Sequence, residues 1–366
     1  MKTIALLLLC PLLAAATEVK LERVPEGGVQ PQVAVAADGA VHLVYLTGKP
    51  DGADIRYSFR KAGDTAWSAP VTVNSEAQCA VAIGTIRGAQ LAVGKAGSVH
   101  VVWNGKAQNG QHATAPLCYA RLEAGKFAAQ RTLNTGTIHL DGGASVAADD
   151  KGGVWVVWHA APPEGKSEAD RRIYVSRSRD DGATFTNAAP AEGAPAGVCA
   201  CCSLKAFFSP AGELLTFYRN ASDKTQRDMT LLTAQEGTAF SSKVLYPWSI
   251  AACPMSSATL LASGKATRAA WETEGTVWTA LVGETPVPVA LSKGKARHPA
   301  LAVNGRGETL VSWSLGTGWQ RGGELGWVVL DANGQPAATR GTAKEVPVWS
   351  HTAAFANAAG DFIILH

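Results

Sequence analysis

Residues 91–103 read LAVGKAGSVHVVW: an apolar run, a turn that contains Gly97, a second apolar run and a closing tryptophan. Five further copies of this pattern lie in near-constant register, at residues 33–45, 145–158, 204–218, 257–271 and 301–313. In all but one copy the turn glycine precedes the closing aromatic residue by six positions, and 257–271 has one extra residue in the turn. A partial seventh copy, TAAFANAAGDFIILH, occupies residues 352–366.

Each copy is typical of a β-hairpin, because two short apolar runs flank a glycine turn and helical periodicity is absent. The closing aromatic residues recur every 42–60 residues, which is enough chain for a four-stranded sheet per repeat. Such sheets bury their faces only against one another, and radial packing of them gives a propeller. The sequence therefore predicts an all-β fold, a single β-propeller with four-stranded antiparallel blades. Counting hairpins gives seven blades, with six as the alternative, and a strand near Val19–Val24 is expected to close the ring.

Residues 1–16 have the features of a secretory signal peptide: Lys2, an apolar run from Ile4 to Leu13, and three alanines at the cleavage site. The propeller domain then covers residues 17–366, and we expect an exported protein, periplasmic or secreted. The formal net charge is +3, and loss of Lys2 leaves +2 (3 minus 1). This small charge argues against nucleic acid as a partner. No later segment has the ~20 consecutive apolar residues of a membrane span.

The third repeat contains a turn motif, Ser178-Arg-Asp-Asp-Gly182-Ala-Thr184-Phe185. In such a turn the carboxylate of Asp180 accepts backbone N–H groups, the glycine takes a positive φ, and the aromatic residue packs into the sheet. The motif marks a fold and gives no indication of catalysis.

Together with the repeats, this motif resembles the Asp-box turn of the sialidase-like propeller superfamily, and the resemblance covers residues 18–366. Four shorter stretches resemble exported bacterial propellers that are commonly labelled sialidase-like: GTIRGAQLAVG (84–94), VCACCSLKA (198–206), CPMSSA (253–258) and AAWETEG (269–275). The resemblance implies a glycan-related propeller whose ligand meets the mouth of the central channel.

The repeat register identifies the residues expected at that mouth. In a propeller the innermost strand of each blade begins, and the second strand ends, at the same rim of the channel. The starts of innermost strands supply Arg87, Asp141, Cys202, Cys253 and Arg297, and the ends of second strands supply Asn104, His159, Arg219 and Glu272. Arg227 lies in a connection at the same rim.

The resemblance to sialidases assigns roles to these residues. Sialidases clamp the carboxylate of their substrate with three arginines, which Arg87, Arg219 or Arg227, and Arg297 match here. Asp141 is the expected acid and Glu272 the expected base, with His159 and Asn104 as further substrate contacts. The start of the family's pattern is matched only loosely, by Arg23-Val24-Pro25, and no tyrosine is placed as the nucleophile. The alternative is that these residues form salt bridges between neighbouring blades.

Six cysteines follow the predicted signal peptide: Cys79, Cys118, Cys199, Cys201, Cys202 and Cys253. An even number in an exported protein favours disulfides. Cys202 and Cys253 occupy equivalent positions in adjacent blades, so we expect Cys199, Cys201, Cys202 and Cys253 to form one cluster. These four residues make either two disulfides or a soft-metal site for Zn or Cu(I). Cys79 and Cys118 flank the second hairpin and are expected to form a disulfide.

Two classes of function follow from these residues. In the first, the propeller binds or hydrolyses an acidic glycan, or another small carboxylated ligand, without a cofactor. In the second, it is a non-catalytic scaffold that carries a cysteine-rich metal or redox site, or an interaction module held by disulfides.

Overall fold

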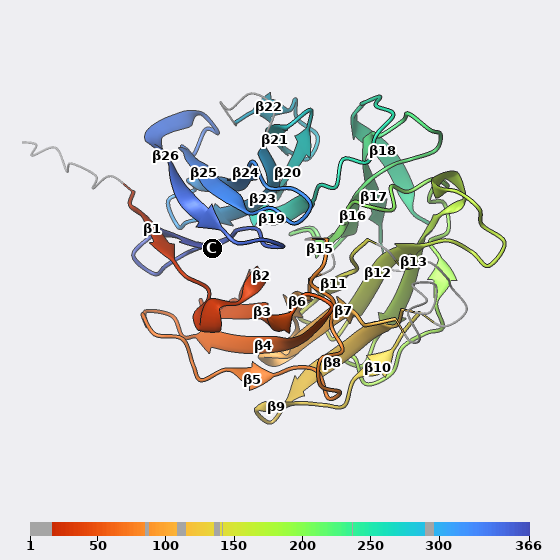
Figure 1. Cartoon of the computed structure of the whole chain (residues 1–366). Helices are drawn as coiled ribbons and strands as arrows, with labels where there is room; N and C mark the ends of the chain where they lie inside the picture. Colours follow the sequence, from red (N-terminus) through yellow and green to blue (C-terminus); the bar gives the residue numbers. More distant parts are fainter. Residues whose placement is uncertain are drawn as a thin grey trace, which may run out of the picture.

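The computed structural model describes residues 17–84, 88–107, 115–134, 140, 142–235, 237–289 and 296–366. Seven β-sheets are arranged around a central axis (Figure 1). In the first six the first strand along the chain is innermost, and in the seventh the strand Ala353–Ala356 is innermost. Neighbouring sheets contact one another through these innermost strands. The seven-bladed propeller predicted from the hairpin count is confirmed, and the six-bladed alternative is wrong.

Six blades contain four antiparallel strands in chain order, with one short extra strand in blade 2. Blades 1 to 3 are β2 (Val29–Val35), β3 (Val41–Lys49), β4 (Gly52–Arg60), β5 (Val71–Thr72); β6 (Gln90–Val93), β7 (Val99–Asn104), β8 (Leu117–Glu123), β9 (Lys126–Phe127), β10 (Arg131–Thr132); and β11 (Ser145–Ala148), β12 (Val154–Ala160), β13 (Arg172–Ser178), β14 (Ala189–Pro190). Blades 4 to 6 are β15 (Lys205–Phe208), β16 (Leu214–Arg219), β17 (Met229–Ala234), β18 (Ser241–Tyr246); β19 (Ala258–Ser263), β20 (Ala266–Thr273), β21 (Thr276–Leu281), β22 (Val287–Pro288); and β23 (Ala296–Val303), β24 (Thr309–Leu315), β25 (Gly323–Leu330), β26 (Pro336–Val346).

Blade 7 closes the ring from both ends of the chain. It consists of β27 (Ala353–Ala356), β28 (Phe362–Leu365) and the N-terminal β1 (Val19–Glu22), in which β1 runs parallel to β28. The expected N-terminal closing strand is confirmed. This blade has three strands, and its outer strand comes from the opposite end of the sequence, so both chain ends hold the ring together.

The closing aromatic residues predicted from the repeats form the core between the blades. Each of the seven interfaces between consecutive blades has its own cluster of buried apolar side chains. The closing residues lie in these clusters and are at most 5% exposed: Tyr45, Trp103, Trp158, Tyr218, Trp271 and Trp313. Burial of one such side chain stabilises the fold by roughly 1.5–3 kcal/mol. The repeat is thus a packing unit.

The propeller has two distinct rims. We call the end where the innermost strands begin the mouth rim, and the end with the hairpin turns the turn rim. At the turn rim, Asp180 accepts hydrogen bonds from the backbone N–H (2.8 Å) and the hydroxyl (2.6 Å) of Thr184. Gly182 has φ 78°, and Phe185 packs edge-on against Tyr119. These contacts match the turn chemistry expected for residues 178–185.

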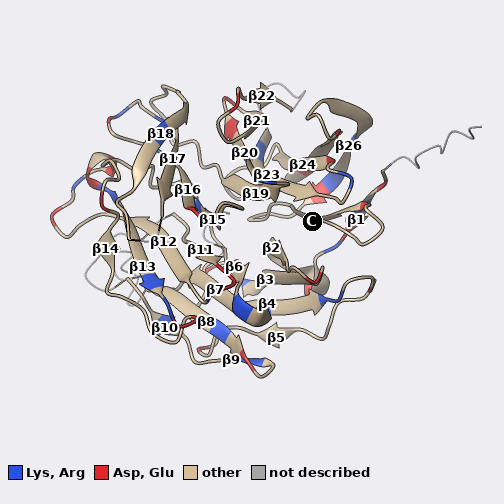
Figure 2. Cartoon of the chain, turned by 180° about the vertical axis from the view of Figure 1, so that it is seen from behind, with Lys and Arg blue, Asp and Glu red and all other residues tan. Residues whose placement is uncertain are grey.

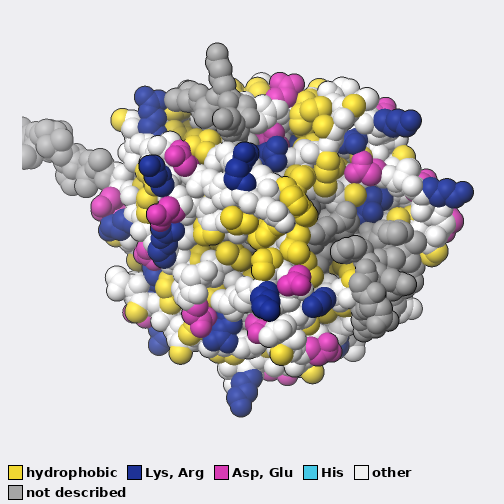
Figure 3. Space-filling model, in the orientation of Figure 1, with side chains coloured by type: hydrophobic (Ala, Val, Ile, Leu, Met, Phe, Trp, Pro, Cys, Tyr) yellow, Lys and Arg dark blue, Asp and Glu magenta, His cyan; other side chains and the backbone are white. Residues whose placement is uncertain are grey.

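Charged side chains of both signs are interspersed over the molecule (Figures 2 and 3). The face shown in Figure 3 has hydrophobic side chains near its centre and Lys, Arg, Asp and Glu side chains towards its edge. Within the described part of the chain, no helix has the length and apolar character needed to cross a membrane.

Candidate functional site

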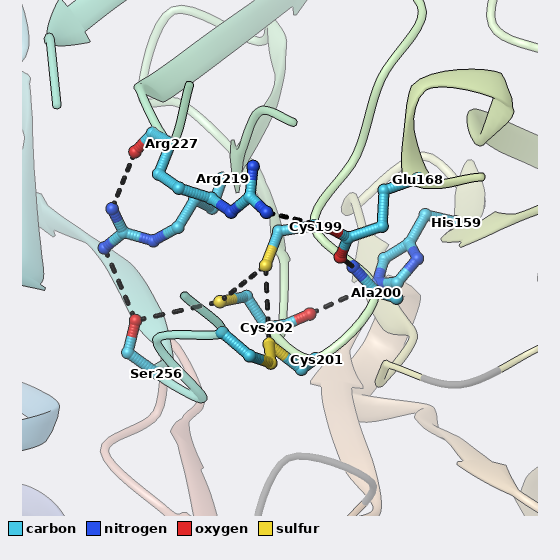
Figure 4. The surroundings of a disulfide bond; sticks show 10 residues. His159, Glu168, Cys199, Ala200, Cys201, Cys202, Arg219, Arg227 and Ser256 are labelled. Atoms are coloured by element: carbon cyan, nitrogen blue, oxygen red, sulfur yellow. Dashed lines mark hydrogen bonds and ion pairs between the residues drawn. A yellow bond between two sulfur atoms is a disulfide. The ribbon is translucent and has the colours of Figure 1, made fainter. Parts of the chain in front are cut away.

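The cysteine loop, residues Cys199–Cys202, is fixed at the mouth rim by groups from blades 3 and 4 (Figure 4). The Cys199 N–H donates to the carbonyl of Arg219 (3.0 Å), and the Ala200 N–H donates to Oε1 of Glu168 (2.7 Å). The carbonyl of Cys202 accepts a hydrogen bond from Nε2 of His159 (3.1 Å). Because Arg171 donates to Nδ1 of this imidazole, the His159 proton is on Nε2.

Two connections approach so closely here that glycine is required. A Cβ on Gly142 would overlap Nε2 of His159 and lie 2.6 Å from the carbonyl oxygen of Cys202. Asn104 holds the same segment, since its Nδ2 donates to the carbonyl of Gly142 (3.1 Å). His159 and Asn104 are buried, and both donate hydrogen bonds to backbone carbonyls of neighbouring loops. The structure therefore places both predicted ligand contacts in the framework around the cysteine loop.

The four cysteines at the mouth rim form one disulfide and one pair of thiols. Cys201 is bonded to Cys253, which links the loops that lead into β15 and β19. Cys199 and Cys202 are free and buried, with their Sγ atoms 3.3 Å apart. The Sγ of Cys199 also lies 3.5 Å from that of Cys201. The predicted cluster is present, but in this state it offers two thiols instead of the four that the predicted metal site would use.

The surroundings of the two thiols give them different pKa values, so one donates a hydrogen bond and the other accepts it. Burial opposes ionisation of Cys202, but the thiol of Cys199 and the guanidinium of Arg219 outweigh it and lower the pKa of Cys202. Donation of the hydrogen bond to Cys202, together with burial, raises the pKa of Cys199. Cys202 is therefore the thiolate of the pair and Cys199 holds the proton.

The arginines predicted to clamp a substrate are engaged with the protein. Arg219 is 2% exposed, donates to the carbonyls of Arg227 (2.8 Å) and Glu272, and stacks on the Trp248 ring. Arg227 forms an ion pair with Oε2 of Glu168 at 2.9 Å. A bidentate clamp needs guanidinium donors that face the ligand. Arg219 and Arg227 instead hold the loops of the mouth together, so the structure favours the interblade-contact alternative for both.

Of the remaining predicted residues, the structure describes Glu272 and Arg297. Oε1 of Glu272 accepts the backbone N–H of Gly275 (2.6 Å), which stabilises the tight turn between β20 and β21. Arg297 is partly exposed on β23, and its guanidinium has no hydrogen bond or ion pair with the described residues. Arg87 and Asp141 lie outside the described residues. Their predicted roles stay predictions.

The second pair of cysteines differs from its prediction. Cys79 and Cys118 are free thiols. Oε1 of Gln130 lies 3.5 Å from Cys79 Sγ, and Nε2 of the same amide lies 4.0 Å from Cys118 Sγ. The predicted Cys79–Cys118 disulfide is absent from the structure, and both thiols contact this shared amide. Burial raises the pKa of Cys118 to about 12.

A cavity of about 100 Å³ lies in the central channel, where the innermost strands begin. It is lined by polar groups from several blades, among them Gln32, Gln90, Ser257, Thr259, His351 and Thr352. Lys205, the first residue of β15, also lines it. Its ammonium has no hydrogen-bond or ion-pair partner among the described residues, and no aspartate or glutamate occurs in this lining. Burial lowers the pKa of Lys205 to about 8.

Two histidines stand beside this cavity. His298 is buried with φ 52°, its Nδ1 is 3.2 Å from Oγ of Ser257, and its ring centre is 6.1 Å from that of His351. Burial, with His351 and Arg297 nearby, lowers the pKa of His298 to about 3. The imidazoles are neutral at pH 7, so Lys205 is the cation among the described residues that line the cavity.

Sequence reasoning missed three features of this region. Lys205 was overlooked because it falls three residues beyond the register position that selected Cys202. Glu168, which contacts both Ala200 and Arg227, lies in a connection where the register makes no prediction. Cys199 and Cys202 have the two-residue gap of a C-x-x-C pair, a signal that was available in the sequence.

No protein-family model and no curated protein matches this chain. Solved structures do match it. An α-L-arabinanase of Penicillium chrysogenum complexed with arabinobiose aligns with a TM-score of 0.55 and 11% identity, over 87% of this chain and 98% of the arabinanase. A protein of unknown function from Dyadobacter fermentans aligns with a TM-score of 0.55 and 12% identity, over 86% and 98%.

A fucose-recognising lectin of Aleuria aurantia, which has six blades, aligns with a TM-score of 0.51 and 13% identity, over 88% of this chain and 96% of the lectin. A Trypanosoma rangeli sialidase aligns with a TM-score of 0.52 and 11% identity, over 83% of this chain and 56% of the sialidase. At these identities the likeness concerns the fold alone. The comparisons therefore show that the chain shares the β-propeller fold of these proteins.

Proposed function

We propose that this protein is a carbohydrate-binding propeller that holds the carboxylate of an acidic sugar in the mouth of its central channel. The observation that carries the proposal is Lys205, a channel-lining ammonium without a partner among the described residues. A partly buried cation without a counter-ion among the described residues opposes stability, so its presence favours a ligand that supplies the negative charge.

The size and lining of the cavity support a carboxylate as the bound group. About 100 Å³ admits a carboxylate with its nearest atoms but not a whole pyranose ring, so the ring would remain at the mouth. Thr259 lines the cavity with Lys205 and offers a hydroxyl donor, whereas the hydroxyls of Ser257 and Thr352 lie 3.2 Å from Nδ1 of His298 and 3.1 Å from Oγ of Ser312, respectively. Because this lining, as described, contains no carboxylate, nothing in it repels an anion.

One observation favours binding over hydrolysis, and a second favours a sugar over other acids as the ligand. Glycosidases of the retaining and inverting types use two carboxylates that flank the scissile bond. Of the two predicted here, Glu272 is engaged with the Gly275 turn, and Asp141 lies outside the described residues. The arabinanase, the fucose lectin and the sialidase that share this fold are all carbohydrate proteins by name, which supports a sugar as the ligand.

The test compares D-glucuronate, D-galacturonate and N-acetylneuraminate with neutral glucose and galactose, by calorimetry or ligand-observed NMR. We expect an acidic sugar to bind and Lys205→Met to weaken it roughly 10–100-fold, the value of a lost charge-assisted hydrogen bond. Without ligand, Lys205→Met should raise the Tm, because it removes an unpaired charge from the channel. Lys265→Met, in the exposed turn before β20, is the matched control and should change neither quantity.

The pH dependence gives an independent readout. Lys205 loses its proton as the pH rises through about 8, so the affinity for the acidic sugar should fall across that range. Equal binding by wild type and Lys205→Met would refute the assignment of Lys205. Equal binding of acetate and the acidic sugars would refute the carbohydrate part of the proposal.

A further inference from the structure

The cysteine cluster has an outer and an inner layer. The outer layer is the Cys201–Cys253 disulfide, in which Cys253 is exposed and Cys201 half-buried. The inner layer is the buried thiol pair of Cys199 and Cys202, 1% and 3% exposed. The Sγ atoms of Cys199, Cys201 and Cys202 all lie within 4.8 Å of one another. A disulfide and a dithiol are therefore in direct contact (Figure 4).

We propose that this cluster is a thiol–disulfide exchange centre, in which the disulfide moves between the Cys201–Cys253 pair and the Cys199–Cys202 pair. The proposal does not depend on sugar binding in the channel. It rests on the sulfur–sulfur contacts, the C-x-x-C spacing of the inner pair, and the guanidinium of Arg219 beside it.

The first step begins with the proton between the inner thiols. Cys199 donates a hydrogen bond to Cys202. Transfer of this proton is unfavourable, because Cys202 has the lower pKa of the two, so it gives a minor population with Cys199 as the thiolate and Cys202 as the thiol. Cys199 Sγ then attacks Cys201 Sγ, from which it is 3.5 Å away. A Cys199–Cys201 bond forms, the Cys201–Cys253 bond breaks, and Cys253 leaves as a thiolate. Since Cys253 is exposed, water stabilises this leaving group.

The second step returns to the inner pair. The proton of Cys202 passes through solvent to the Cys253 thiolate, and Cys202 Sγ attacks Cys199 Sγ. A Cys199–Cys202 bond forms and Cys201 leaves as a thiolate. The whole sequence begins and ends with one disulfide, one thiol and one thiolate, so no external oxidant or reductant is required. Its result is the release of the covalent tie between the loops of blades 4 and 5.

The surroundings of the inner pair favour a thiolate. Arg219 donates to Oγ of Ser256 (3.4 Å), and the same oxygen is 3.9 Å from Cys202 Sγ. A buried thiolate beside a guanidinium is the environment of reactive cysteines. The thiols of Cys79 and Cys118 provide the internal contrast, because Gln130 is the neighbour they share and burial raises the pKa of both.

Tryptic cleavage makes the two pairings distinguishable. Cys199, Cys201 and Cys202 share the peptide 180–205, and Cys253 lies in the peptide 244–265. The protein is incubated near pH ~8, where thiolates are available, quenched in acid, alkylated under denaturing conditions and digested. In the outer pairing the two peptides are linked. In the inner pairing they separate, with a disulfide inside 180–205 and both Cys201 and Cys253 alkylated.

We expect wild type to give both forms in a ratio that becomes constant with incubation time. Cys199→Ser should abolish the inner disulfide and leave only linked peptides. Cys202→Ser should stop after the first step, with a disulfide between Cys199 and Cys201. Cys118→Ser is the control and should leave the ratio unchanged. Near-ultraviolet circular dichroism establishes that each variant is folded.

Two results would overturn the proposal. One is a wild-type protein that gives only linked peptides with two alkylated cysteines in 180–205 at every time. The other is a protein with two permanent disulfides and no alkylated cysteine in either peptide. The wild-type measurement needs no variant, so misfolding of a mutant cannot obscure either outcome.

Discussion

Asp180 at the turn rim and Cys202 at the mouth rim are held by opposite kinds of contact. At the turn rim, the carboxylate of Asp180 contacts Ser178 and Thr184, which are its neighbours in sequence, and it is fully paired there. At the mouth rim, Cys202 is surrounded by His159 from blade 3 and Ser256 from the connection to blade 5.

The difference indicates which rim carries function. The local hydrogen bonds of Asp180 shape a loop and engage both oxygens of its carboxylate. The mouth rim keeps two thiols next to a disulfide and, on Lys205, an ammonium without a partner among the described residues, an arrangement that opposes stability. Groups that oppose stability cluster at functional sites.

The largest expected effect is at the mouth rim. The Cys201–Cys253 bond spans 52 residues, so Cys253→Ala should lower the free energy of unfolding by about 4 kcal/mol through the added chain entropy of the unfolded state. Cys118→Ala removes a buried sulfur but no cross-link, and about 1 kcal/mol is expected. Urea denaturation under non-reducing conditions measures both. Equal losses in the two variants would show that the disulfide does not staple the mouth.

The next effect is at the turn rim. A Cβ on Gly182 would overlap the hydroxyl of Tyr119, and its φ of 78° disfavours any other residue. Gly182→Ala should therefore lower the free energy of unfolding by about 3 kcal/mol. Gly212→Ala is the matched control, since Gly212 has φ 81° with no atom within 4 Å of an added Cβ, and it should cost about 1 kcal/mol. Sugar binding at the mouth should survive both; its loss in the folded Gly182→Ala protein would contradict the separation of the two rims.

The sequence predicts the turn rim much better than the mouth rim. Turns and hairpins depend on neighbours in the chain, so the glycine-to-aromatic spacing was enough to predict seven blades and the residues 178–185 turn. Closure by β1 also followed from the count, because a partial repeat at the C-terminus lacks an outer strand.

The structure of the mouth depends on the orientation of long side chains and of loops. The strand register gives the position of a residue but not the direction in which its side chain points. The register placed Arg219 and Glu272 at the mouth rim correctly, but it contains no information on whether a guanidinium faces the channel or a backbone carbonyl. The cysteines show the same limit. Cys202 and Cys253 have equivalent register, yet Cys201 is the residue bonded to Cys253, while Cys202 Sγ lies near Ser256.

The smallest effect, and the sharpest contrast with Lys205, is the pH dependence of the Asp180 turn. Hydrogen bonds from Thr184 and Ser178 hold the pKa of Asp180 well below its ordinary value. For a carboxyl with a depressed folded pKa, the unfolded state binds more protons, so its stabilisation is present above the unfolded pKa of about 3.9 and is lost as the pH falls further. Asp180→Asn should therefore be less stable than wild type at pH 7, by a small amount because the turn is exposed.

The difference in the free energy of unfolding between Asp180→Asn and wild type should disappear as the pH falls below the pKa of the free carboxyl group. Chemical denaturation at a series of pH values measures this difference. Lys205, a cation, also makes the stability depend on pH, but in a higher pH range than Asp180. Its lowered pKa makes the folded state lose the proton first, so stability rises between pH about 8 and the ordinary lysine value of 10.5, and Lys205→Met removes this rise. An Asp180→Asn difference that persists unchanged in acid would mean that the turn is held by its backbone and Gly182, without a contribution from the carboxylate charge.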